Sequence, residues 1–174
     1  MHQIRTEILI QASTDVVWAV LTDFRSYGRW NPFIRAIEGR AAVGERLALT
    51  TRQRGSDTQR SQGVVLRLQP RRELCWRGRG GSGWLMQTVR AFRLDALPEG
   101  GVRMRHVRQV RGLLSPLLHL TSHEPAEQQM HEMNTALKER AERAHRAGSA
   151  PRTAAEEAER ADRTTRLNNA LNWR

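Results

Sequence analysis

The chain has 174 residues, of which 39% are hydrophobic and 27% charged, a balance typical of a globular protein with one core. Its 29 basic residues outweigh 18 acidic ones, so the formal net charge is +11, and nucleic acids, anionic membranes and acidic ligands are candidate partners. The longest apolar run, residues 16–21, is far too short to span a bilayer, so we expect no transmembrane helix.

The N-terminus and the cysteine content indicate a cytoplasmic protein. The first seven residues carry charge where a signal peptide needs its apolar segment, which argues against export by that route. Cys75 is the only cysteine of the sequence, so an intrachain disulfide and a multi-cysteine metal cluster are both excluded. We therefore expect a reducing, cytoplasmic environment.

The N-terminal third predicts a strand followed by two short helices. Residues 3–11 alternate apolar and polar side chains, with Leu9 as the exception, which is typical of a half-buried strand. Ser13 offers a helix N-cap, and apolar residues follow at helical spacing. A second short helical turn carries Tyr27 and ends before Pro32, because a proline disfavours helical backbone at the preceding residue.

The middle of the chain predicts six strands in an antiparallel meander. Glycines, prolines and polar residues separate the strands, which follow one another too closely for intervening helices. The expected strands are 34–38, 46–54, 64–69, 74–77, 84–94 and 102–111.

A helix closes the predicted domain. Ser115 can cap it, Pro116 suits its first turn, and Pro125 begins or kinks a longer segment. In that segment, apolar residues recur at helical spacing at Met130, Met133, Leu137, Ala141 and Ala144. We expect one domain over residues 1–147 and a polar tail over 148–174, rich in Ala, Arg and Glu, that is disordered or a frayed helix.

Several stretches carry a family resemblance beyond the order of elements. They are ASTDVVWAVLTDF at 12–24, Tyr27, WNPF at 30–33, GLLSPLL at 112–118 and MNTALK at 133–138. Together they resemble the polyketide cyclase/dehydrase branch of the SRPBCC (START-like) superfamily over about residues 3–145. The resemblance implies an α+β helix-grip fold, in which a curved antiparallel sheet of about seven strands surrounds a long C-terminal helix, with two short helices after the first strand.

The resemblance also implies a range of functions. Such proteins hold lipids, sterols, polyketides or other apolar molecules in a cavity between sheet and helix, and some catalyse reactions there. We expect this chain to bind a hydrophobic, lipid- or polyketide-like molecule without a cofactor. The alternative is a polyketide cyclase- or dehydratase-type enzyme, because one architecture carries many activities.

Inward-facing positions nominate the residues that line such a cavity. The candidates are Trp30, Asn31, Trp76, Trp84, Met86, Phe92, Met104, Met133 and Leu137, together with Leu49 and Leu66. The competing interpretation is that the apolar members simply form the core. Methionine and tryptophan shift the balance towards a ligand, because methionine adapts to irregular shapes.

Three basic side chains share the inward face of two strands joined by a short hairpin. Arg90, His106 and Arg108 have the same parity as Phe92, and neighbouring strands lie about 4.8 Å apart, so these groups can converge. A buried arginine needs a carboxylate, water or a ligand oxygen, and Glu38 is a candidate internal partner. The competing interpretation is a strand near the sheet edge whose arginines reach water.

The resemblance adds one expectation about these residues. In many relatives the position that matches Arg108 is a glutamate, so a more basic pocket, suited to an anionic or carbonyl-rich ligand, is implied.

His106 is the candidate catalytic acid or base, with Arg90 or Arg108 polarising a carbonyl. Adjacent cations should lower the pKa of His106, although a lone strand histidine is more often structural.

Other functions have weaker support in the sequence. The remaining histidines have no spacing typical of a metal site, so we expect no metal. Nucleic-acid binding is the less favoured interpretation of the charge, because the arginines alternate along strands without a basic helix or interleaved aromatic residues. A third class is an interaction module built on the tail and Trp173; the oligomeric state is not indicated by the sequence.

Overall fold

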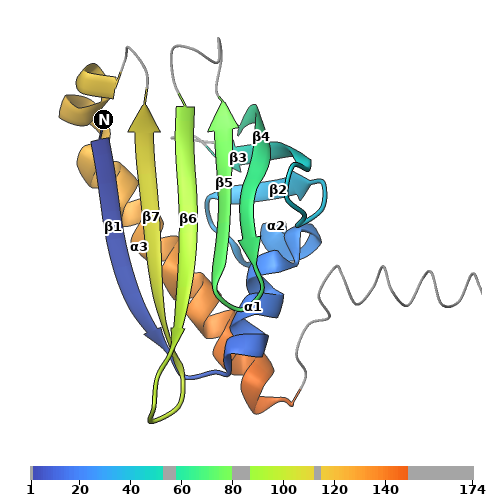
Figure 1. The fold of residues 1–174 in the computed structure, drawn as a ribbon. Helices are drawn as coiled ribbons and strands as arrows, with labels where there is room; N and C mark the ends of the chain where they lie inside the picture. Colours follow the sequence, from blue (N-terminus) through green and yellow to red (C-terminus); the bar gives the residue numbers. More distant parts are fainter. Residues whose placement is uncertain (1, 53–57, 80–86, 112–114, 149–174) are drawn as a thin grey trace, which may run out of the picture.

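The computed structural model describes residues 2–52, 58–79, 87–111 and 115–148, which fold into one sheet and a long helix (Figure 1). The elements in chain order are β1 (His2–Ile10), α1 (Thr14–Thr22), a 3-10 turn (Phe24–Ser26), α2 (Tyr27–Trp30), β2 (Ile34–Glu38), β3 (Arg46–Arg52), β4 (Thr58–Gln69), β5 (Glu73–Arg79), β6 (Gln87–Ala96), β7 (Val102–Arg111) and α3 (Ser115–Arg146). The predicted tail, apart from Gly148, lies outside the described residues.

The seven strands confirm the predicted helix-grip architecture. They form one antiparallel sheet in the order β1-β7-β6-β5-β4-β3-β2, so the first strand pairs with the last. In Figure 1, α3 crosses one face of the curved sheet diagonally, and α1 and α2 lie towards one end of it. Among the described residues, no helix is both long and apolar enough to cross a membrane.

Local hydrogen bonds explain where the short helices begin and end. The Ser13 hydroxyl accepts from the Val16 backbone N–H at 3.4 Å, which confirms the predicted N-cap of α1. The Tyr27 hydroxyl donates to the Leu21 carbonyl at 2.7 Å and so ties the second short helix to the first. At the end of α2, Asn31 Oδ1 accepts from two backbone N–H groups, those of Phe33 at 2.9 Å and Ile34 at 2.8 Å.

Several element boundaries and one strand face differ from the sequence predictions, most clearly at β4 and α3. β4 begins at Thr58 rather than 64, and α3 begins at Ser115 and continues past Pro125. A register shift between Val65 and Arg67 in β4 turns Val65 inward, at 1% exposure, and leaves Leu66 38% exposed. The placement of Leu66 on the inner face was therefore wrong, because a bulge interrupts the alternation.

The core lies between the inner face of the sheet, α1 and α3. Nearly every residue of α1 is buried, and α3 contributes side chains at helical spacing. The fully buried residues of this core include Leu21, Phe92, Met104, Met133 and Leu137. This interface is the setting of the polar residues considered next.

We predict that Gly28→Ala destabilises the fold, because α2 packs directly on the backbone of β2. A Cβ at Gly28 would lie 2.2 Å from the Arg35 carbonyl oxygen, so the backbones must separate. We expect the free energy of unfolding to fall by about 1–3 kcal/mol, as in other overpacked sites. Urea denaturation measures the loss.

Gly78→Ala is the matched control. A Cβ there would meet only the Thr88 carbonyl oxygen, at an ordinary contact distance of 3.9 Å, so its stability should match that of the unaltered protein. An unaltered unfolding midpoint for Gly28→Ala would contradict the close approach.

Candidate functional site

Two arginines face each other on the inner side of the sheet. Arg90 on β6 is the register partner of Arg108 on β7, and the same row continues to Trp76 on β5 and Ile4 on β1. Like charges directly opposite each other on a sheet destabilise it. Arg90 is only 7% exposed, so its charge is held away from water and requires compensation from its surroundings.

The described contacts of Arg90 are all with uncharged groups. Its Nη1 lies 3.4 Å from His106 Nε2 and donates to Met133 Sδ at 3.7 Å, and its guanidinium carbon lies 5.2 Å from the centre of the Phe33 ring. Burial, and to a lesser extent the charge of Arg108, lowers the pKa of Arg90 to about 9. The side chain is therefore still a cation at neutral pH.

Within the described ranges, no carboxylate forms an ion pair with Arg90 or Arg108. Glu38, the predicted internal partner, is exposed on β2, which lies at the edge of the sheet far from β6 and β7. That prediction was wrong, because the strand order separates the two sites and the residue faces solvent.

His106 belongs to a buried chain of hydrogen bonds that joins the sheet to α3. Its Nδ1 lies 2.9 Å from Asn134 Oδ1, and Asn134 Nδ2 donates to Thr6 Oγ1 at 2.8 Å. An amide oxygen can only accept, so Nδ1 carries the proton and Nε2 offers its lone pair to Arg90. The chain thus runs from β6 through β7 and α3 to β1.

The surroundings of His106 keep its ring neutral. The ring is fully buried and stacks on Phe92, with centroids 4.2 Å apart and an interplanar angle of 24°. Burial, followed by the charge of Arg90, lowers the pKa of His106 well below its ordinary value. The sequence predicted a lowered pKa for His106 and attributed it to adjacent cations. The lowered pKa agrees with that prediction, although burial is a larger cause than the cations.

Three buried N–H groups on the inner side have no hydrogen-bond partner within the described part of the chain. They are Trp30 Nε1, Asn31 Nδ2 and Arg108 Nε. Asn31 Oδ1 accepts from the backbone N–H of Phe33, whose ring lies 5.2 Å from the guanidinium carbon of Arg90. These groups are all donors, so the arrangement suits a ligand that offers acceptors.

The other predicted site residues fall into two groups. Trp76, Phe92, Met104, Met133 and Leu137 are buried in the core cluster, and Trp30 packs against it. Trp84 and Met86 lie outside the described residues.

Sequence reasoning missed Asn134, Thr6 and Phe33 as members of the site. Thr6 shares the inward parity of its strand, which was a signal that could have identified it. Asn134 is a polar residue beside buried Met133 on α3, but nothing local in the sequence indicates its partner.

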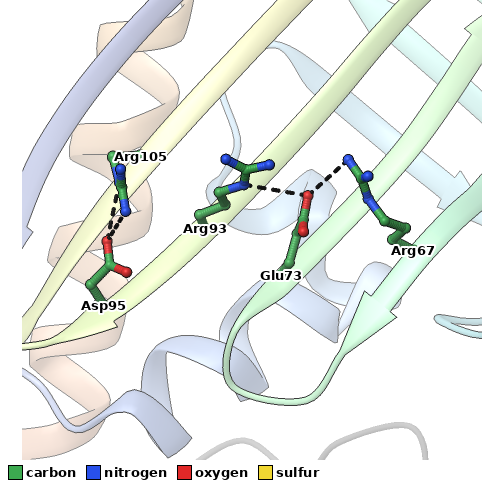
Figure 2. A network of polar contacts seen from close by, with 5 residues as sticks. All are labelled: Arg67, Glu73, Arg93, Asp95 and Arg105. Carbon is green, nitrogen blue, oxygen red and sulfur yellow. Dashed lines mark hydrogen bonds and ion pairs between the residues drawn. The ribbon is translucent and has the colours of Figure 1, made fainter.

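Four arginines on the opposite face of the sheet, Arg67, Arg93, Arg103 and Arg105, pair with carboxylates. Figure 2 shows Glu73 between Arg67, at 3.1 Å, and Arg93, at 3.5 Å. In the same view, Arg105 binds Asp95 Oδ2 through Nη2 at 2.6 Å and Nε at 3.1 Å. These outer-face arginines have carboxylate partners, whereas Arg90 and Arg108 on the inner face have none in the described chain.

Comparisons with known proteins give one family and one fold. The family described as polyketide cyclase / dehydrase and lipid transport matches residues 1–164. A search of curated proteins finds no significant match.

Solved structures of the same fold include a protein of unknown function from Staphylococcus aureus, with a TM-score of 0.65 and 15% identity over 82% of this chain and 94% of that one. Ara h 8.0201 has a TM-score of 0.64 and 16% identity, covering 80% and 97%. The di-domain ARO/CYC StfQ from the steffimycin biosynthetic pathway has a TM-score of 0.62 and 12% identity, covering 84% of this chain and 51% of that one.

We predict that buried, neutral His106 makes the protein less stable in acid. Its folded pKa lies well below 6.5, whereas the unfolded imidazole titrates near 6.5, so below that pH the unfolded state binds more protons. The free energy of unfolding therefore falls as the pH is lowered, by at most about 1.4 kcal/mol per pH unit from this group. His106→Gln should show a shallower decline between about pH 6.5 and 5, measured by urea denaturation at each pH.

His131→Gln removes an exposed histidine of α3 and serves as the control, with the decline expected to match that of the unaltered protein. The charged groups that act on His106 are Arg90 and Arg108, which stay cationic throughout this range. Identical slopes for His106→Gln and the unaltered protein would refute the buried neutral imidazole.

Proposed function

Because the chain belongs to the polyketide cyclase / dehydrase and lipid transport family, we propose that it binds an apolar small molecule bearing oxygen acceptors, held between the inner face of the sheet and α3. One observation carries this proposal. Arg90 is buried at 7% exposure among Phe33, His106 and Met133, with no carboxylate partner among the described residues.

The polar end of the ligand is argued from the needs of Arg90. A buried cation in apolar surroundings is strongly unfavourable unless acceptors replace the water it has lost. The nitrogen of His106 and the sulfur of Met133 are distant or weak acceptors, at 3.4 and 3.7 Å. A ligand oxygen would supply the stronger interaction, and the Nε of Arg108, which has no partner in the described chain, is a further donor for it.

The apolar body of the ligand is argued from the side chains around this polar end. Trp76 is the register neighbour of Arg90, and Met133 on α3 accepts a hydrogen bond from Arg90. Met104 and Leu137 extend the same buried cluster. Methionine side chains accommodate irregular apolar shapes with little loss of packing, so this surface suits a lipid or a polyketide chain.

Binding is favoured over catalysis by the state of His106. A general base needs a lone pair within hydrogen-bond reach of the substrate. The ring of His106 is fully buried, Asn134 engages Nδ1, and Arg90 lies against Nε2. We therefore assign His106 as a positioning residue that orients Arg90, and the cyclase or dehydratase alternative has no accessible base in the described site.

The outer face does not favour a nucleic acid as partner. The arginines drawn in Figure 2 are held by Glu73 and Asp95, and Arg103 pairs with Glu7 at 3.2 Å. Phosphate groups would have to compete with these carboxylates on the sheet itself.

A photoactivatable alkyl alcohol carrying a diazirine tests the proposed binding. We predict that it labels buried residues between the sheet and α3, with Trp76 and Met133, which adjoin Arg90, and Leu137 of the same core cluster as the expected positions. Peptide mapping by mass spectrometry after irradiation locates the label. An excess of 1-dodecanol should suppress it, because both molecules compete for one site.

Exposed Leu9 and Leu66 are internal controls, since they offer apolar surface to the probe without a site, at 46% and 38% exposure. Labelling confined to these two residues, or labelling that 1-dodecanol does not suppress, would contradict the proposed function.

A further inference from the structure

The opposed arginines can be spanned by one small group. Directly opposite residues of an antiparallel pair have Cβ atoms about 4.5–5.5 Å apart, and Arg90 and Arg108 are such a pair. Each guanidinium presents several N–H donors in a planar fork. A compact group with two or more oxygens is therefore of the right size to accept from both.

The two positive charges of Arg90 and Arg108 determine which chemical class of group fits between them. Their neighbours in the same row, Trp76 and Ile4, carry no charge. The polar contacts of Arg90 in the described chain, His106 Nε2 and Met133 Sδ, are both with uncharged groups. A neutral carbonyl would satisfy hydrogen bonds but leave two cations side by side, whereas an anion would satisfy the donors and remove the repulsion.

The outer face of the same sheet supplies an internal comparison. There, Glu73 on β5 lies between Arg67 on β4 and Arg93 on β6 (Figure 2). One carboxylate therefore pairs with arginines of both flanking strands. The inner pair also consists of two arginines, here on directly neighbouring strands, and has no such carboxylate in the parts of the chain that are described. An oxyanion, which offers the negative charge and acceptor oxygens that the Glu73 carboxylate supplies on the outer face, would pair with both inner arginines.

We infer that the ligand ends in an oxyanion, a carboxylate or a phosphate, which is clamped between Arg90 and Arg108 while its apolar chain lies against α3. This inference rests on the proposed function and names the chemical class of its ligand. Charge-assisted, bidentate contacts of this kind are about twice as strong as neutral hydrogen bonds, so the anionic end should dominate selectivity.

Three probes with the same twelve-carbon chain test the clamp by isothermal titration calorimetry, at neutral pH and below the concentrations at which they form micelles. They are laurate, monododecyl phosphate and 1-dodecanol. We expect at least one of the two anions to bind about tenfold or more tightly than the alcohol, which corresponds to one bidentate ionic contact. A preference for laurate or for the phosphate identifies the source of the oxyanion.

Arg108→Met and Arg103→Met are matched variants on β7, since both remove one positive charge from a side chain of similar length. Arg108 shares the inner row, whereas Arg103 lies on the outer face and pairs with Glu7. Arg108→Met should reduce the preference for the anion to within about twofold, while Arg103→Met retains it.

The outcomes separate the two proposals. Equal affinity of the unaltered protein for the alcohol and both anions overturns the clamp and leaves the proposed function standing. An anion preference that survives in Arg108→Met also overturns the clamp. No binding of any probe by the unaltered protein overturns both, and this comparison requires no variant to fold.

Discussion

The hydrogen-bonded chain from Arg90 through His106 and Asn134 to Thr6 is the constraint on which the inner architecture depends. It crosses an otherwise apolar interface, where an unsatisfied polar group costs about 1–3 kcal/mol, so each member must keep its partner. Sliding α3 along the sheet would break the bonds of Asn134 on both sides. The same chain fixes the tautomer of His106 and thereby the direction in which Arg90 is held.

Arginine serves two distinct purposes on the two faces of this sheet. On the outer face it pairs with carboxylates of neighbouring strands, as with Arg105 and Asp95, and its stem covers apolar surface; Cys75, the register partner of Arg67, is only 1% exposed there. On the inner face Arg90 is buried and Arg108 is partly buried, and neither has such a partner in the described chain. The arginines that give the chain its net charge of +11 therefore lie in different environments.

The period-two alternation of strands predicted much of this arrangement. It placed Arg90, His106 and Arg108 on one inner face, because a short hairpin fixes the register of the two strands that carry them. It failed at Leu66, where a bulge shifts the alternation without a local sequence signal. The partners of Asn134 lie 28 and 128 residues away, so they depend on how α3 docks, which no local pattern encodes.

The pairing of the first strand with the last has a consequence for how the chain folds. His2 pairs with Val110 and Ile10 with Val102. β1 therefore cannot pair with β7 until most of the domain has been synthesised. Contacts between such distant segments slow folding, because loop-closure entropy must be lost before they form. The nascent chain therefore presents β1 as an unpaired strand edge that is open to aggregation until β7 has been synthesised.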